Sequence, residues 1–210
     1  DIEPSRDHAI TGTIPFFGGL TSTTLDPTLQ PPLEEQWLFL PIEDDGIRFD
    51  EKRVIPYEPF MGTMGVAPEI EAVNSLTPDY YGGNMDCVET RPGNEVWFPV
   101  QVKGAHFFTG DAHASQGDGE VTGVGLEIPA KVTVSFDLKK RYSINWPRIV
   151  SDDFIMAAGS ARPLIAAARI AWVELIDWMV SDYGFDRMKA YHLLDQVGQM
   201  RLGNMVDPKY

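Results

Sequence analysis

The sequence has little that would form disulfides, bind polyanions or cross a membrane. Its 210 residues include one cysteine, Cys87, which excludes an internal disulfide framework and a thiolate-rich metal cage. The net charge of −14 argues against binding to nucleic acid or to anionic membrane surfaces. No apolar run is long enough to span a bilayer, and no secretory signal opens the chain. These absences favour a cytoplasmic protein that handles a neutral or cationic small molecule, although the acid excess can also serve solubility alone.

Several common catalytic and phosphate-binding motifs are absent as well. The sequence contains no G-x-S-x-G nucleophile elbow and no H-E-x-x-H zinc helix. It also lacks the phosphate-binding loop G-x-x-x-x-G-K-[ST], and no G-x-G-x-x-G opens a helix. Any chemistry must therefore come from a different set of residues.

Composition divides the chain into three parts. Residues 1–35 are rich in Thr, Pro and Gly and are predicted to be irregular. Residues 36–150 are predicted to form a β-rich catalytic body, and residues 151–210 a helical region of the same domain. The sum predicts an α+β fold, with a sandwich-like or barrel-like β-body and a C-terminal helical hairpin.

Alternation of apolar and polar residues predicts the strands of this body. Period-two patterns favour strands at 96–102 and 132–138, and 121–128 is a third candidate that two glycines interrupt. The apolar segment 60–68 also contains two glycines, which suggests close backbone packing or a bulge.

Helical periodicity begins after about residue 150. Apolar residues at spacings of three and four predict a helix from 161 to 180, with Ser160 as its N-cap and Gly184 as its stop. A second helix is predicted at 186–197, and the short connection implies an antiparallel pair.

Two polar, glycine-rich blocks are the strongest candidates for a functional site. They are residues 81–86 (YGGNMD) and 110–120 (GDAHASQGDGE). Such segments bury little apolar surface, and their glycines cost backbone entropy on folding. A function is therefore a better explanation for them than packing alone.

The acidic residues and the histidine of these blocks suggest a divalent-metal site. Carboxylates and an imidazole are usual ligands of a catalytic Zn²⁺ ion, and a spare carboxylate can act as a general base. Asp111 and His113 face the same side if the segment is extended. A turn at Asp118-Gly119 would fold Glu120 back toward them, and Asp86 completes the set. The alternative is that the glycine merely turns a hairpin and His113 is a hydrogen-bonded loop residue.

Other reactive side chains have simpler interpretations. Cys87 could be a thiol nucleophile paired with His113, but a lone cysteine is more often a small buried hydrophobe. His106 and His192 are expected to be structural, and nothing local decides the role of His8.

The chain resembles the acetamidase/formamidase family in three consecutive blocks. Residues 59–68 (PFMGTMGVAP) are similar to the family's P-x-x-G-x-x-G-x-A-P block, and residues 82–86 to its G-G-N-M-D block. Residues 110–120 are similar to its signature G-D-x-H-A-x-Q-G-D-G-E. The resemblance extends over residues 30–208 and includes Val206-Asp207-Pro208 near the end.

This resemblance implies a hydrolase of small amides such as formamide and acetamide, or of a γ-lactam, on a β-rich fold with a divalent metal. Carried onto this chain, it implies that Asp86 and His113 hold the ion, with Glu120 as a further ligand or as the general base. Asp111 and His113 are further candidate catalytic groups. Asn84 and Gln116 are the candidates for binding substrate. Zn²⁺ is the metal expected first, and such ligands also accept Mn²⁺ or Fe²⁺.

The start of the chain departs from the family. Members carry a long N-terminal β-rich region that precedes these blocks, whereas this sequence begins at Asp1 within what reads as the middle of a chain. We therefore expect a second chain to supply that half in an oligomeric assembly. The alternative function is a non-catalytic binding or regulatory subunit of such a two-chain assembly.

Overall fold

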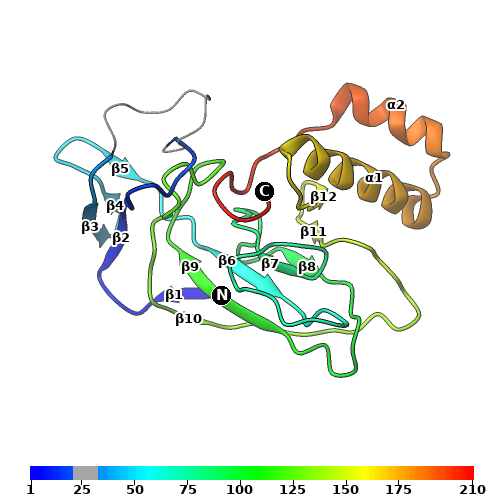
Figure 1. The fold of residues 1–210 in the computed structure, drawn as a ribbon, viewed down its shortest axis with the longest axis horizontal. Helices are drawn as coiled ribbons and strands as arrows, with labels where there is room; N and C mark the ends of the chain where they lie inside the picture. The colour runs from blue at the N-terminus through cyan, green and yellow to red at the C-terminus, as the bar shows by residue number, and fades with distance from the viewer. Residues whose placement is uncertain (21–32) are drawn as a thin grey trace.

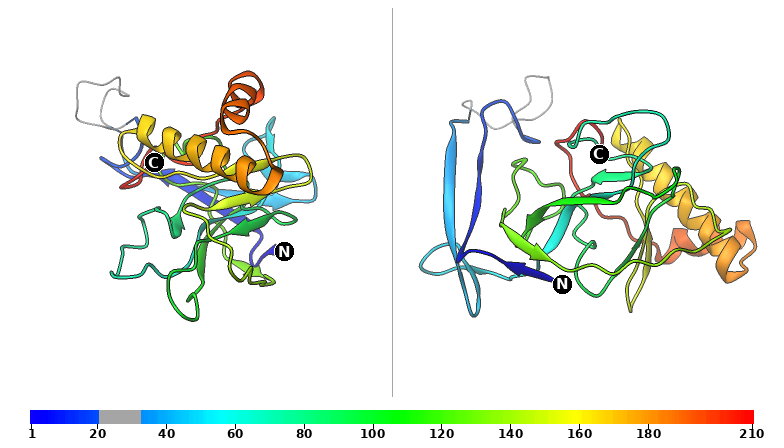
Figure 2. Two further views of the ribbon diagram at one scale, coloured as in Figure 1. Left: turned by 90° about the vertical axis from the view of Figure 1, so that its right-hand side faces the viewer. Right: turned by 90° about the horizontal axis from the view of Figure 1, so that it is seen from below.

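The computed structural model describes residues 1–20 and 33–210 and shows an α+β fold. A β-rich body occupies most of the molecule, and two helices lie at one end of it (Figure 1). The right-hand view of Figure 2 places the helices at the end opposite the strands of residues 8–13 and 36–43. The predicted fold class, a β-rich body followed by a C-terminal helical hairpin, is confirmed.

Four antiparallel sheets make up the described part of the body. The outer sheet contains β2 (His8–Thr13), β3 (Gln36–Glu43), β4 (Gly46–Arg48) and β5 (Val54–Ile55), in that order. The central sheet has β6 (Phe60–Gly65) between β7 (Gly82–Asn84) and β9 (Phe108–His113). The two smaller sheets pair β1 (Ile2–Pro4) with β10 (Ala130–Val132), and β11 (Arg148–Val150) with β8 (Glu95–Trp97) and β12 (Ile155–Ala157).

The hydrophobic core lies between the outer sheet, the central sheet and the β1–β10 pair. Its buried members include Ala9, Leu40, Ile47, Met61, Ala112 and Leu126. The central strand β6 is buried along most of its length because it has a neighbour on both edges. It therefore forms a rigid base for the side chains that project from β7 and β9.

The prediction for residues 1–35 needs correction. Residues 2–4 and 8–13 are strands rather than irregular structure, because their backbones pair with β10 and β3, which are distant in sequence. A composition rich in Thr and Gly gives no local sign of such long-range pairing. Residues 21–32 of that segment lie outside the described residues. The division of the chain into three parts stays a prediction.

The predicted strands are shorter in the structure. Of the 96–102 candidate, only Val96 and Trp97 pair, as part of β8, and the chain leaves the ladder before Pro99, which has no N–H to donate. The 132–138 candidate contributes only the end of β10, and Phe136 and Leu138 of its apolar face are exposed. The 121–128 candidate contains only the isolated bridges of Glu127. The alternation of apolar and polar residues identifies an apolar face in each segment. It does not predict whether another strand is available to pair with it.

The two predicted helices are present. α1 (Leu164–Tyr183) begins three residues later than predicted, with Pro163 rather than Ser160 at its N-cap, and it ends at Gly184 in the left-handed conformation. α2 (Arg187–Val197) begins after Asp186, whose side chain accepts a hydrogen bond from the Lys189 N–H. Neither of the helices described here is long and apolar enough to cross a membrane.

A buried ion pair connects α1 to the sheet of β8, β11 and β12. The guanidinium of Arg148 on β11 lies 2.7 Å from Glu174 Oε1 on α1, and both side chains are almost fully buried. Arg148 also packs over the Trp178 ring, 4.9 Å from its centroid. Because each charge compensates the other away from water, this pair fixes where α1 sits on the body.

Candidate active site

The central sheet carries the predicted site. Asp86 follows the end of β7, and Asp111 and His113 lie on β9, so the two neighbours of β6 bring them together. Both carboxylates lie over the backbone of Gly62 in β6. A Cβ atom at that position would be 2.4 Å from Asp111 Oδ2 and 2.6 Å from Asp86 Oδ1. Gly62 therefore leaves room for two side-chain carboxylates. The predicted close backbone packing in segment 60–68 is found at Gly65, where an added Cβ would lie 2.6 Å from the Tyr81 carbonyl oxygen.

Three acidic residues of the site have strained backbones. Asp86, Asp111 and Glu120 adopt positive φ values of 46°, 59° and 43°, in the left-handed region that non-glycine residues rarely occupy. Such strain costs free energy and persists where the surrounding structure imposes it, often at functional sites. Here the strained residues are the ones whose carboxylates converge.

His113 is completely buried at the centre of the cluster. Its ring packs edge-on against Phe60, and a Cβ at Gly125 would lie 2.6 Å from its Nδ1. Nδ1 is hydrogen-bonded to Gln116 Oε1 at 2.8 Å. Because a carbonyl oxygen only accepts, Nδ1 must carry the hydrogen, and Nε2 is the nitrogen that faces the acidic residues.

The other nitrogen of the imidazole has close acidic neighbours but no hydrogen bond of ordinary geometry. Nε2 of His113 lies 3.3 Å from Asp111 Oδ1 and 3.2 Å from Glu127 Oε1. Asp86 is also fully buried. Its Oδ2 accepts a hydrogen bond from Asn84, while its Oδ1 has no partner. Two buried polar atoms without partners therefore belong to the same cluster.

Glu120 reaches the cluster through the predicted turn. The chain turns at Asp118-Gly119, and Gly119 has a φ of +90°. The side chain of Glu120 is nearly buried, and its Oε1 accepts a hydrogen bond of 3.0 Å from the Gly125 N–H. Asp118 points away from the cluster and pairs with Arg201 at 2.7 Å. The turn is therefore as predicted, but Asp118 is not part of the acidic cluster.

Two acidic residues of the cluster were not among the predicted site residues. Glu127 joins His113 and Glu120, and Asp207 lies on the far side of Asn84. Glu127 sits in the segment that we predicted to be a strand, and its only signal was a carboxylate in an otherwise apolar run. Asp207 had a signal in the resemblance of residues 206–208 to the family's tail, but nothing local connected it to the site.

The pKa values reflect the crowding of like charges. Burial and then the negative charge of Glu120 raise the pKa of the Asp86 carboxyl well above its usual value. Burial, with the charges of Glu127 and Asp207, raises the pKa of Glu120 to about 7. Burial alone would lower the pKa of His113, but the carboxylates of Asp111 and Glu127 outweigh it and raise that pKa well above its usual value.

These residues fit a divalent cation. Two sets of ligand atoms each lie within 4.8 Å of one another, one from Asp86, Asp111 and His113 and one from His113, Glu120 and Glu127. Carboxylate oxygen and imidazole nitrogen are the donors that Zn²⁺ and Mn²⁺ accept. The unpartnered Asp86 Oδ1 and His113 Nε2 are suitable ligand atoms, and a cation would offset the excess of negative charge.

The remaining candidates lie outside this arrangement. Burial raises the pKa of Cys87 to about 11, so its thiol is a poor source of nucleophilic thiolate near neutral pH. His106 and His192 are exposed and belong to neither group of possible ligands. His8, the first residue of β2, is hydrogen-bonded to the side chain of Asp7.

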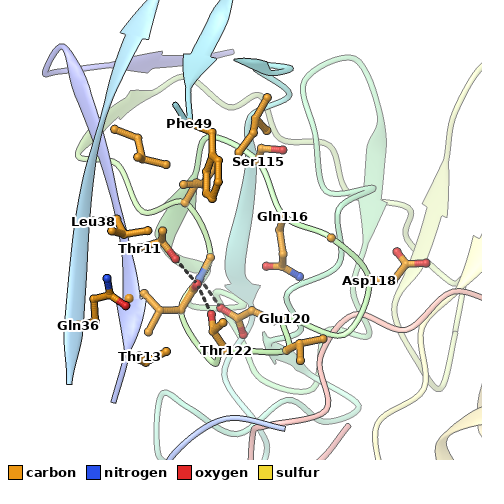
Figure 3. A pocket seen from close by; sticks show the side chains of 18 residues that line it. Thr11, Thr13, Gln36, Leu38, Phe49, Ser115, Gln116, Asp118, Glu120 and Thr122 are labelled. Atoms are coloured by element: carbon orange, nitrogen blue, oxygen red, sulfur yellow. Dashed lines mark hydrogen bonds between the residues drawn. The ribbon is translucent and has the colours of Figure 1, made fainter. Parts of the chain in front are cut away.

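A cavity of about 480 Å³ opens beside Glu120 (Figure 3). Thr11, Leu38 and Phe49 lie on the side of the outer sheet, and Gln116 and Glu120 lie on the opposite side. Most of its surface is apolar, and Glu120 is the one residue of the acidic cluster that lines it. The cavity therefore gives access to the cluster from the side of the outer sheet.

Comparison with known proteins relates the chain to one family. The sequence model described as the Acetamidase/Formamidase family matches residues 67–208, which include every predicted site residue. A formamidase from Methylophilus methylotrophus is 38% identical over 82 residues, which make up 37% of this chain and 20% of that protein.

Solved structures show the same fold. The acetamidase from Yersinia enterocolitica is 46% identical, with a TM-score of 0.94, and is matched by 100% of this chain. The chain spans 64% of that acetamidase. A γ-lactamase from Delftia acidovorans, 20% identical with a TM-score of 0.58, shares the fold with 92% of this chain.

Gly62→Ala should disturb the cluster. The added methyl group would collide with the carboxylates of Asp86 and Asp111, and overpacking of this kind costs about 1–3 kcal/mol. We expect a lower free energy of unfolding in urea and displaced carboxylates in a crystal structure of the variant.

Gly110→Ala is the matched control, because it lies on the adjacent strand with no atom within 4 Å of its added Cβ. It should change the free energy of unfolding by less than about 0.5 kcal/mol. Equal losses in the two variants would contradict the role assigned to Gly62.

Proposed function

Because the chain belongs to the acetamidase/formamidase family, we propose that it carries the catalytic site of an amidohydrolase that cleaves small amides or a γ-lactam with the help of a divalent metal ion. The observation that carries the proposal is the pair of buried, unpartnered atoms, Asp86 Oδ1 and His113 Nε2, among four further carboxylates. A packed core gains nothing from such a cluster, whereas a hydrolytic site with a cation uses it.

The proposed ligands are Asp86, Asp111 and His113, whose ligand atoms lie within 4.8 Å of one another. A bound divalent ion supplies Lewis-acid polarisation of the amide carbonyl and lowers the pKa of water. The Gln116 carbonyl keeps the hydrogen of His113 on Nδ1, so that Nε2 faces the site. Zn²⁺ is the metal we propose first, on the strength of the mixed imidazole and carboxylate donors.

Glu120 is the proposed general base. Its carboxylate lines the cavity and faces His113, and one of its oxygens is held by the Gly125 N–H. Glu120 accepts a proton from the attacking water as the new C–O bond forms, and returns it to the nitrogen as the C–N bond breaks. The products are a carboxylate and ammonia, or an amino acid when a γ-lactam is opened.

Activity and its metal dependence can be measured together. The complete natural protein should release ammonia from formamide or acetamide, or open a γ-lactam. A chelator such as EDTA should abolish this, and added Zn²⁺ or Mn²⁺ should restore it. A protein that hydrolyses none of these amides in the presence of either ion would favour the non-catalytic subunit, and activity that survives complete removal of metal would contradict the metal role.

Glu120→Gln tests the base. The glutamine oxygen can still accept the Gly125 hydrogen bond, so the fold should be kept while the proton acceptor is lost. We expect kcat to fall by about 10²–10⁴-fold with little change in Tm.

Asp118→Asn is the matched control, because Asp118 lies two residues earlier in the same loop and pairs with Arg201 outside the cluster. An exposed ion pair contributes about 0–1 kcal/mol to the free energy of unfolding. Because its loss should not disturb the cluster, we expect kcat to stay within about fivefold of the wild-type value. Full activity in the Glu120 variant would refute the base assignment.

We also propose that the part of the family fold that this sequence does not span covers an apolar surface of the described body. The β1–β10 ladder continues to hydrogen bonds between Asp1 and Thr133, and the apolar Val134, Phe136 and Leu138 beyond it are exposed. Trp37 and Phe39 on β3 are also exposed. Since this chain spans 64% of the Yersinia acetamidase, the remaining part of that fold is the occupant that we assign to these apolar surfaces.

In the complete natural protein, Val134→Asp with Phe136→Asp should lower the free energy of unfolding in urea, because charges would enter an apolar contact. An unchanged free energy of unfolding would refute the assignment of this surface to the rest of the fold.

A further inference from the structure

The C-terminal segment from Leu202 to Asp207 passes directly behind the acidic cluster. The Gly119 N–H donates to the Leu202 carbonyl, and the Met205 N–H donates to the Gly119 carbonyl, at 2.7 and 2.9 Å. Asn204 and Asp207 are buried although both are polar. This segment, here called the tail, thus contacts the turn that carries Glu120.

One carboxamide links the tail to Asp86. The Nδ2 atom of Asn84 lies 2.8 Å from Asp86 Oδ2 and 2.8 Å from Asp207 Oδ2, so both of its hydrogens are donated to carboxylates. Its Oδ1 accepts a hydrogen bond from the Thr63 hydroxyl. A reversed amide would place a carbonyl oxygen against two carboxylates, so these three partners fix the orientation of the group.

A second carboxamide links the tail to His113. Gln116 Nε2 donates to the carbonyl oxygens of Asp86 and Gly203, each at 3.0 Å. This leaves Oε1 facing His113 Nδ1. Asn84 and Gln116, which the sequence suggested as binders of substrate, both donate their amide hydrogens to groups of the protein.

We infer that Asp207 is a positioning residue: through the Asn84 carboxamide it holds the Asp86 carboxylate by Oδ2 and leaves Oδ1 free for the ion. Asp207 is itself held in place, because its N–H donates to Asn204 Oδ1 at 3.1 Å and its carbonyl accepts from Arg162. Without the Asp207 acceptor, one Asn84 hydrogen would be buried and unpaired, and the amide would be free to rotate away from Asp86. This inference rests on the proposed metal-dependent function.

The geometry separates positioning from direct ligation. Asp207 is in neither group of convergent ligand atoms, and its Oδ2 is occupied by the Asn84 hydrogen bond. Groups that orient a ligand in this way typically contribute about 10–100-fold to metal affinity. An uncharged side chain that still accepts the Asn84 hydrogen bond should therefore preserve most of the metal affinity. The same change at a carboxylate that binds the ion directly would not.

Two variants of the complete natural protein test the inference. Asp207→Ala removes the acceptor and should weaken Zn²⁺ or Mn²⁺ affinity, measured by competition with a chromogenic chelator, by about 10–100-fold. Asp207→Asn keeps an acceptor oxygen for Asn84 and should recover most of that affinity. Lys209→Gln is the control: it breaks the part-buried pair with Asp79, which makes no side-chain hydrogen bond with Asn84, and it should bind like the wild type.

Unchanged affinity in a folded Asp207→Ala variant would overturn the inference, and so would a loss in Asp207→Asn as large as that in Asp207→Ala. A crystal structure of Asp207→Ala gives a readout that needs no metal and no activity. Rotation of the Asn84 amide and of the Asp86 carboxylate would support positioning, and an unmoved Asp86 would refute it. Wild-type protein that binds no divalent ion would refute the proposed function, and the crystal structure would still decide the positioning role.

Discussion

The structure depends most on the burial of several carboxylates around one imidazole. Like charges in a poorly solvated space raise the free energy of the folded state, and the raised pKa values of Asp86 and Glu120 express that cost. The chain tolerates it through Gly62, which leaves room for two carboxylates, and through left-handed backbone at three acidic residues. The divalent cation that we propose would offset this repulsion, and it would explain why so costly an arrangement is built into the centre of the sheet.

Local features of the sequence predicted the parts of the fold that depend on local physics. The periodicity of α1 and α2, the left-handed stop at Gly184 and the turn at Asp118-Gly119 were all predictable from neighbouring residues. Strands were not, because β1 and β2 are formed by pairing with residues far along the chain. The apolar alternation at 132–138 predicts a buried face, which requires another part of the fold to pack against it. Among the described residues, that face is exposed.

The same distinction applies to the site. Asp86, His113 and Glu120 could be named from two short blocks, whereas Glu127 and Asp207 are brought in by backbone bridges and by the tail. Polar residues in a signature also invite the interpretation that they touch substrate. For Asn84 and Gln116, an inventory of hydrogens shows that both amide hydrogens of each are donated to protein oxygens, and substrate binding by these residues stays a prediction. Such an inventory requires partners that are distant in sequence, and so only the structure supplies it.

A basic side chain from the rest of the family fold is the physical competitor of the ion, since it too would offset the negative charge. The cavity beside Glu120 is lined by no other member of the acidic cluster, so a chain that enters there meets Glu120 first. Asp86 and His113 are completely buried behind it, against the central sheet and the tail. A lysine paired with Glu120 would therefore leave Asp86 Oδ1 without a partner and His113 Nε2 with only its acidic neighbours, whereas an ion held by Asp86, Asp111 and His113 would contact both residues. The Asn84 carboxamide holds Asp86, and the Gln116 carboxamide holds His113, each with its remaining oxygen or nitrogen toward the cluster. This arrangement also favours an ion over a lysine.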